Sequence, residues 1–321
     1  MQHILISRTD AIGDVVLTLP VCGLIKKHLP DAKISFLGNS YTKEIISSSV
    51  FVDHFINYND WDGNDEKAIA ELKDLNIDTI IHVFPKQKIA YLALRAGITN
   101  RIGTTHRIYH WLYCNKLIKL TRKNSHLHES QLNIKLLEGL GIQAELELKD
   151  IQQYYGLNPE KLIAPDFAEL LSKDKFNLII HPKSSGSAKE WSLDRYAELI
   201  DMIDHTKFKI FISGSQKEKK QLREWIKNQG NKVTDITGKF TLQQFVSFIS
   251  HADGLIAAST GPIHLAAAMG INALGLYPNS SSINARRWGP IGIKAGFVES
   301  DTANINSISP ETVMNVVNLW R

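Results

Sequence analysis

Cysteine is scarce in this chain and long apolar runs are absent, and both absences narrow its class. The 321 residues include only Cys22 and Cys114, too few for a disulfide framework, so a reducing cytoplasm is the expected compartment. No stretch is long and apolar enough to span a bilayer, and the N-terminus enters a strand pattern without a basic and apolar leader. We therefore expect a soluble or peripherally attached protein, with neither a signal peptide nor a membrane span.

An excess of one charge is also lacking. The formal net charge is +4, and 22% charged with 43% hydrophobic residues is typical of a globular protein, which excludes a disordered or fibrous chain. So small a charge gives no argument for nucleic acid as a partner. Basic residues do gather between Arg95 and Lys123, interleaved with Tyr109, Trp111 and Tyr113. This segment is either a solvated basic face or a surface for an anionic acceptor or anionic lipid headgroups.

Strand and helix patterns alternate along the whole chain, which predicts βαβ units and mostly parallel sheets. Strands are expected at residues 4–7, 33–37, 54–57, 79–83, 101–102, 177–181, 209–213, 233–236 and 255–258. Helices are expected at residues 15–28, 65–75, 87–96, 127–140, 193–203, 217–228, 242–250 and 310–320. The pattern weakens around residues 150–166, so we predict two doubly wound domains, 1–160 and 161–321. Ligands of such sheets bind at the C-terminal ends of the strands, here in a cleft between the domains.

Ser259-Thr260-Gly261-Pro262 follows the apolar run 254–258 and opens a helix of small residues. Free backbone N–H groups at such a helix start, together with the helix dipole, favour an anionic group such as a phosphate. Pro262 suits the first helical turn, and Gly261 allows a ligand close to the backbone. Turns of this kind also occur without a ligand, so the pattern alone leaves both interpretations open.

A second strand–glycine–helix turn lies near the N-terminus, where Arg8 to Asp14 follow the first expected strand. A carboxylate in the first turn of a helix is stabilised by the helix dipole and should be ionised near neutral pH. Asp14 is therefore either a simple helix-start residue or a functional carboxylate. The loop 182–191 holds hydroxyls, a glycine and two lysines after another strand, which suits a diphosphate or a plain polar loop.

Taken together, these segments resemble glycosyltransferase family 9, the heptosyltransferases of lipopolysaccharide core synthesis. The similarity rests on Ile-Gly-Asp with Pro six residues later (Ile12 to Pro20), on Lys189-Glu190-Trp191, and on the Thr-Gly-Pro-x-His segment that begins at Thr260. It implies a GT-B fold, a nucleotide-sugar donor bound by the C-terminal domain and an anionic glycolipid acceptor bound by the N-terminal one. The implied reaction is inverting and metal-independent, with no cofactor, in the cytoplasm or in peripheral contact with the inner membrane.

The resemblance also assigns roles to residues. Asp14 matches the family's general base and Lys189 the lysine that neutralises the leaving diphosphate. The residues expected to bind the donor are Ser184, Ser185, Ser259, Thr260, Gly261, Pro262 and His264, although His264 can equally be an interior residue. The residues expected to bind the acceptor are Arg8, Gly13, Arg101 and Arg107.

One position departs from the family pattern, and it opens alternatives. Many relatives carry Asp where this chain has Ser259, and a hydroxyl lacks the charge of that carboxylate. The donor sugar is therefore heptose or a hexose. Two other hypotheses stay open: a GT-B-like sugar-nucleotide epimerase or hydrolase, and a non-catalytic paralogue that binds nucleotide sugars or core glycans.

Two patterns mimic metal sites. Residues 60–65 with Glu71 nearly match a calcium loop, but Asp65 stands where the sharp turn of such a loop needs Gly. The pair His126-x-His128 lacks further ligands at a suitable spacing. We predict a metal at neither place.

Overall fold

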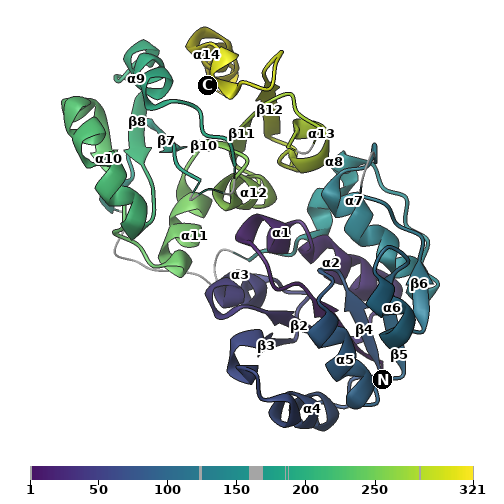
Figure 1. Cartoon of the computed structure of the whole chain (residues 1–321). Helices are drawn as coiled ribbons and strands as arrows, with labels where there is room; N and C mark the ends of the chain where they lie inside the picture. Colours follow the sequence, from purple (N-terminus) through teal and green to yellow (C-terminus); the bar gives the residue numbers. More distant parts are fainter. Residues whose placement is uncertain are drawn as a thin grey trace. The chain divides into compact units, whose positions relative to one another are not determined.

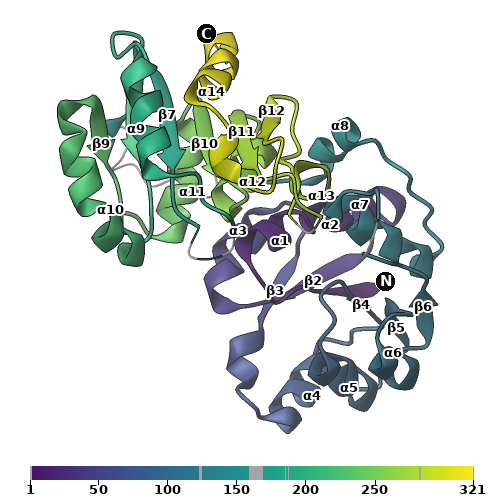
Figure 2. The same cartoon turned by 45° about the horizontal axis from the view of Figure 1, so that its top comes forward.

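The computed structural model describes residues 2–122, 125–158, 169–184, 186, 188–281 and 283–320. The chain divides into two compact units, Met1–Asn158 and Pro159–Arg321, so the division lies two residues from the predicted boundary. Within the described residues each unit holds a six-stranded parallel sheet with helices on both faces (Figures 1 and 2). The predicted α/β class, with two doubly wound domains, is confirmed.

The strands of the N-terminal sheet, in chain order, are β1 (His3–Ser7), β2 (Lys33–Gly38), β3 (His54–Asn57), β4 (Thr79–His82), β5 (Asn100–Thr104) and β6 (Lys116–Ile118). The helices of this unit are α1 (Ile12–Val16), α2 (Leu19–His28), α3 (Lys43–Ser48), α4 (Asp65–Asp74), α5 (Gln87–Arg95), α6 (Ile108–Tyr113), α7 (Glu129–Ile134) and α8 (Leu148–Ile151). Helices α4, α5 and α6 pack in one layer, and α1, α2, α3 and α7 make contacts in another (Figure 1). A buried apolar cluster joins α4 and α5 to the sheet.

The strands of the C-terminal sheet are β7 (Phe176–His181), β8 (Phe208–Ile212), β9 (Val233–Asp235), β10 (Gly254–Ala258), β11 (Asn272–Tyr277) and β12 (Ala295–Glu299). Its helices are α9 (Leu193–Met202), α10 (Gln216–Asn228), α11 (Leu242–His251), α12 (Gly261–Ala268), α13 (Ala285–Trp288) and α14 (Pro310–Val317). Side chains of α9, α10 and α14 share one buried cluster with the sheet. Trp191 lies in it and donates a 3.1 Å hydrogen bond from Nε1 to the Ile308 carbonyl.

The two sheets have the same strand order. The N-terminal sheet runs β3-β2-β1-β4-β5-β6, and the C-terminal sheet, listed from its other edge, runs β9-β8-β7-β10-β11-β12. In each unit the first strand pairs with the fourth. From this pair the first three strands follow one another toward one edge of the sheet, and the last three follow one another toward the other edge. The point between the two paired strands is the topological switch, where ligands bind in doubly wound folds. In the N-terminal unit it lies between β1 and β4, and in the C-terminal unit between β7 and β10.

Two predicted helices are wrong in detail. The helix expected at 15–28 is two helices, because α1 ends at Val16 and α2 starts at Leu19 with Pro20 in its first turn, a residue that a helix interior excludes. The helix expected at 127–140 is α7 followed by a 3₁₀ segment, Lys135–Leu140. It ends, as predicted, at Gly141, which adopts φ 77°.

The last segment of the N-terminal unit packs back onto its first helices. A Cβ added to Gly23 on α2 would lie 2.4 Å from the Tyr154 carbonyl oxygen, so this contact requires glycine. Nearby, the Ser49 hydroxyl donates to the Tyr155 carbonyl at 3.0 Å, and the Asn158 N–H donates to the Ser48 carbonyl at 3.1 Å. Residues 152–158 therefore belong to the N-terminal unit.

No helix in the part of the chain that the structure describes combines the length and the apolar character that crossing a membrane requires.

Candidate active site

Asp14 lies in the first turn of α1, just beyond the C-terminal end of β1 and beside the N-terminal switch point. Its carboxylate accepts a hydrogen bond from Nη2 of Arg8, the first residue after β1. The same guanidinium donates from Nε to Asp10 at 2.7 Å, and its Nη1 lies 3.6 Å from Glu129 on α7. One buried arginine is thus shared by three carboxylates.

A chain of hydrogen bonds leads from Glu129 back to Asp14. Arg122 donates from Nε to Glu129 at 2.9 Å and from Nη2 to the Asn133 side chain at 3.2 Å. The Asn133 amide donates to the Thr18 hydroxyl at 3.3 Å, and that hydroxyl donates to the Asp14 carbonyl at 2.8 Å. The ring is closed, so Asp14 is fixed through both its side chain and its backbone.

The charges of this ring set the proton affinity of its carboxylates. Its three carboxylates face two guanidiniums, those of Arg8 and Arg122. Burial raises the pKa of Asp14; Arg8 opposes this and Glu129 adds to it, which leaves the pKa above its usual range. Burial likewise raises the pKa of Asp10 to about 6, despite the neighbouring Arg8. A carboxylate with a raised pKa accepts a proton more readily than a solvated one, which suits a general base.

In the C-terminal unit the two predicted donor-binding segments follow neighbouring strands. The loop 182–191 leaves β7 and residues 259–264 leave β10, and His181 pairs in register with Ala257. Both segments therefore start at the same edge, at the C-terminal switch point.

The loop after β7 is organised by Glu190, a residue of the Lys-x-Trp motif to which no role was assigned from the sequence. The Glu190 carboxylate accepts from Nζ of Lys183 at 2.6 Å, and from the N–H and hydroxyl of Ser184 at 2.9 and 3.0 Å. Lys189, the lysine predicted to meet the diphosphate, is exposed. The buried hydroxyl of Ser184 bonds Glu190 and the Ala188 carbonyl within the loop, and its contact with a donor phosphate stays a prediction. Ser185 lies outside the described residues.

The start of α12 matches the sequence prediction. Gly261 is its first residue and Pro262 its second, while Thr260 is the N-cap but makes no side-chain cap bond. The Thr260 hydroxyl is buried and has no hydrogen-bond partner among the described residues. Ser259, the first residue after β10, is half-buried. His264 is buried, in agreement with its interior alternative.

Two residues predicted to bind the acceptor, Arg8 and Arg101, have hydrogen-bond partners within the N-terminal unit. Arg8 was expected to face an anionic acceptor, but it is buried and its guanidinium is bound to carboxylates. Arg101 lies near the start of β5, in register with Ile80 of β4. Asp14, by contrast, lies beyond the C-terminal ends of the strands. The Arg101 guanidinium donates to the carbonyls of Ile98 and Tyr113, the latter at 2.6 Å. The structure therefore does not bring Arg101 together with Asp14.

Gly13 and Arg107, the other two residues predicted to bind the acceptor, lie nearer to the C-terminal ends of the strands. Gly13 is in α1 directly before Asp14, and Arg107 is the exposed N-cap of α6, beyond the C-terminal end of β5. Their contact with an acceptor stays a prediction.

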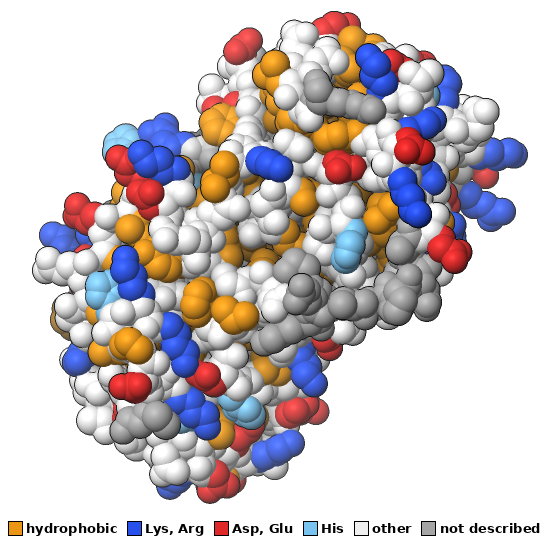
Figure 3. Space-filling model, turned by 180° about the vertical axis from the view of Figure 1, so that it is seen from behind, with side chains coloured by type: hydrophobic (Ala, Val, Ile, Leu, Met, Phe, Trp, Pro, Cys, Tyr) orange, Lys and Arg blue, Asp and Glu red, His pale blue; other side chains and the backbone are white. Residues whose placement is uncertain are grey.

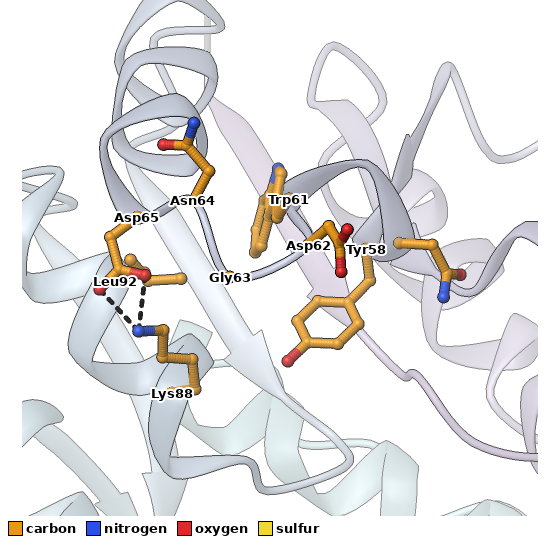
Figure 4. A pocket seen from close by; sticks show the side chains of 9 residues that line it. Tyr58, Trp61, Asp62, Gly63, Asn64, Asp65, Lys88 and Leu92 are labelled. Atoms are coloured by element: carbon orange, nitrogen blue, oxygen red, sulfur yellow. Dashed lines mark hydrogen bonds and ion pairs between the residues drawn. The ribbon is translucent and has the colours of Figure 1, made fainter.

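The segment that mimics a calcium loop forms a pocket of about 280 Å³ in the N-terminal unit (Figure 4). Its carboxylates do not converge. Asp65 pairs with Lys88 at 2.6 Å, and Glu71 accepts from the Trp61 indole at 2.7 Å. His128 caps α7 by accepting from the Ser130 N–H at 3.1 Å. Across the described ranges, no group of three or more His, Cys, Asp or Glu side chains could hold a metal ion.

Comparison with known proteins agrees with this geometry. The profile of glycosyltransferase family 9 (heptosyltransferase) matches residues 66–316. Lipopolysaccharide core heptosyltransferase OpsX of Haemophilus influenzae is 25% identical over 286 residues, which cover 86% of this chain and 79% of that protein. Lipopolysaccharide heptosyltransferase 3 of Escherichia coli K12 is 24% identical over 290 residues, 86% of this chain and 82% of that protein.

Among solved structures, the ADP-heptose lipopolysaccharide heptosyltransferase II of Escherichia coli has a TM-score of 0.81 at 19% identity, covering 100% of this chain and 98% of its own. This likeness shows the GT-B fold. Because the family profile spans more than three quarters of the chain, the protein belongs to glycosyltransferase family 9 and is a glycosyltransferase.

Proposed function

We propose that this enzyme transfers a sugar, heptose or a hexose, from a nucleoside-diphosphate donor to an anionic glycolipid acceptor of the lipopolysaccharide-core type. The observation that carries the proposal is the ring of hydrogen bonds, closed by the Arg8–Glu129 ion pair, that holds Asp14 at the N-terminal switch point. The names of the relatives, lipopolysaccharide heptosyltransferases, support the substrate class. Ser259, where many relatives carry Asp, keeps the hexose alternative open.

In the proposed reaction Asp14 accepts the proton of the acceptor hydroxyl while that oxygen forms a bond to the anomeric carbon. The bond from this carbon to the donor phosphate oxygen breaks on the opposite side, so the configuration inverts and the nucleoside diphosphate leaves. Lys189, from the loop after β7, would neutralise the negative charge of the departing diphosphate. The N–H groups at the start of α12 would stabilise the same charge. No metal or cofactor has a part in these steps.

The test compares two carboxylates on the same guanidinium. Asp14→Asn should lower kcat roughly 10²–10⁴-fold, because the base is lost, while the donor Kd changes little. Asp10→Asn is the matched control: it also removes a carboxylate from Arg8 but should retain most of the activity. Equal turnover in Asp14→Asn and the wild-type enzyme would reject Asp14 as the base.

Three further measurements test the donor, the reaction type and the metal requirement. A thermal-shift panel of nucleoside diphosphates and nucleotide sugars identifies the donor, because a bound donor raises Tm by mass action. Assays with and without acceptor separate transfer from the epimerase or hydrolase alternative, which needs no acceptor. Absence of any turnover would favour the non-catalytic alternative.

Transfer should also persist in EDTA. Loss of transfer in EDTA would reject the metal-independent mechanism.

A further inference from the structure

Helix α6 exposes three large apolar side chains on one face. Ile108, Trp111 and Leu112 are 85%, 63% and 69% exposed, and their spacing of three and four residues places them side by side on the helix. The opposite side of the helix is anchored, because His110 is buried and its Nδ1 accepts from the Thr104 N–H at 2.9 Å. Neighbouring large apolar side chains that are exposed together often mark an interaction surface, whereas single ones do not.

Trp111 has a hydrogen-bond partner despite its exposure. Its indole Nε1 donates to the Thr105 carbonyl at 3.0 Å, so the polar edge of the ring is satisfied and the apolar remainder faces outward. Such amphipathic rings are enriched where a protein meets the interface of a membrane.

The sequence around α6 lacks negative charge. Residues 79–128 contain nine Lys and Arg but no Asp or Glu, so the rest of a chain with net charge +4 carries −5. Arg107 precedes α6 and Lys119 follows β6, and both are exposed. On the face that Figure 3 shows, Lys and Arg side chains are mixed with acidic and polar ones among the described residues. Helix α6 thus lies in the longest stretch of the sequence without an acidic residue, although Lys88, Arg95 and Arg122 of this stretch pair with carboxylates from outside it.

The size of this face argues against a stable protein interface. Three side chains with these exposures offer on the order of 400 Å², whereas a stable interface uses about 800 Å² on each partner. A membrane needs less, since a few inserted apolar side chains and neighbouring cations act together.

We propose that α6, with Arg107 and Lys119, is a docking surface for an anionic lipid membrane. Ile108, Trp111 and Leu112 enter the headgroup region, and the two cations contact lipid phosphates. The surface is separate from the Asp14 ring, and the proposal does not depend on which sugar is transferred.

The experiment measures binding of the full-length enzyme to vesicles of phosphatidylglycerol and phosphatidylethanolamine that contain neither donor nor acceptor. Binding should increase with the phosphatidylglycerol fraction and fall with salt. The triple variant Ile108→Ser, Trp111→Ser, Leu112→Ser should bind at least tenfold more weakly, with an unchanged Tm, since these side chains are exposed. Arg107→Gln with Lys119→Gln should weaken binding by about tenfold.

The C-terminal unit supplies matched controls. Ile293 and Leu319 are 85% and 84% exposed, and Lys217 and Lys220 are exposed lysines. Serine at the first pair and glutamine at the second should leave vesicle binding unchanged. Brominated lipid should quench the tryptophan fluorescence of the wild-type enzyme, and Trp111→Phe should remove that quenching.

Three results would overturn the proposal. The first is equal vesicle binding by the triple serine variant and the wild-type enzyme. The second is binding only to vesicles that contain acceptor glycolipid, which would make the contact part of substrate recognition. The third is a dimer that the triple variant dissociates, which would make α6 a contact between copies of the chain. Acceptor glycolipid is added only in a separate arm that tests the second result, and no arm measures sugar transfer, so inactivity in the transfer assay affects none of these results.

Discussion

At the N-terminal switch point one buried arginine is shared by three carboxylates. At the C-terminal one a single ion pair, Lys183–Glu190, organises the loop after β7, and beside it lie the N-terminus of α12 and the exposed Lys189. The strand order of the two sheets is the same, so topology does not account for this difference. A carboxylate that accepts a proton from a bound substrate must have a defined orientation, and this requires partners that hold it in place. A surface that receives an anionic ligand needs donors that are still available when the ligand arrives. The comparison therefore suggests one unit that positions a base and one that binds the donor.

The largest expected effect comes from breaking the N-terminal ring. Glu129→Gln leaves Arg8 and Arg122 without their shared buried carboxylate, and loss of one partner from a buried ion pair costs about 3 kcal/mol. We expect the free energy of unfolding to fall by that amount, and kcat to fall roughly tenfold to hundredfold as Asp14 loses its orientation. Urea unfolding and steady-state kinetics measure the two effects.

The donor Kd of Glu129→Gln separates positioning from general damage, since it should match that of the wild-type enzyme. Glu147→Gln, which removes an exposed carboxylate from Lys149, is the control and should change neither quantity. An unaltered kcat and pH profile in Glu129→Gln would mean that the ring does not serve the base.

A second test concerns the buried histidines that end two central strands, His82 on β4 and His181 on β7. The His181 Nδ1 bonds the Ser213 hydroxyl at 2.9 Å, but neither ring nitrogen of His82 has a hydrogen-bond partner in the described part of the chain. Burial lowers the pKa of His82 to about 3, from 6.5. Below pH 6.5 His82 therefore takes up a proton in the unfolded state but not in the folded state. The free energy of unfolding decreases as the pH falls from 6.5 toward 3.

For His82 alone this loss is about 3 kcal/mol between pH 7 and pH 4.5. His82→Leu removes the titrating group and no hydrogen bond. In this variant the free energy of unfolding should therefore fall by that much less between pH 7 and pH 4.5. Urea unfolding at the two pH values checks it. The same acid dependence in His82→Leu as in the wild-type enzyme would show that His82 is protonated in the folded state.

The smallest expected effect is at the C-terminal switch point. The Thr260 hydroxyl is buried without a partner among the described residues, so Thr260→Val removes no hydrogen bond from the ligand-free protein. Stability should be unchanged or slightly higher, while donor affinity should fall about fivefold if the hydroxyl binds the donor. Isothermal titration with the identified donor measures this. Unchanged affinity would remove Thr260 from the donor site and reduce the contrast between the two units.

Much of the fold follows from local patterns. Strong apolar runs predicted β1, β2, β7 and β10 to within about a residue, and Gly141 correctly ended its segment. The edge strand β6 and the short helix α6 were missed, because three to six residues give too little periodicity to detect. The order of the strands is a property of the folded sheet and could not be read from any single segment.

Only those residues of the candidate site that belong to a recognisable sequence motif were predicted. Asp14 and Thr260 lie at the turns that their motifs predict. Glu129 and Glu190 were missed because a single sequence does not show that a glutamate is buried or bonded to a residue far along the chain. For the same reason the partners of Arg8 and Arg101 within the N-terminal unit could not be predicted.

The close approach of Gly23 to Tyr154 has a practical consequence for dissecting the enzyme. A fragment meant to fold as the N-terminal unit alone should extend to Asn158, since one that stops at Glu147 would leave the surface of α2 around Gly23 uncovered. For the same reason a bulkier residue at position 23 would push the end of the fragment away from α2 and act much like the truncation itself.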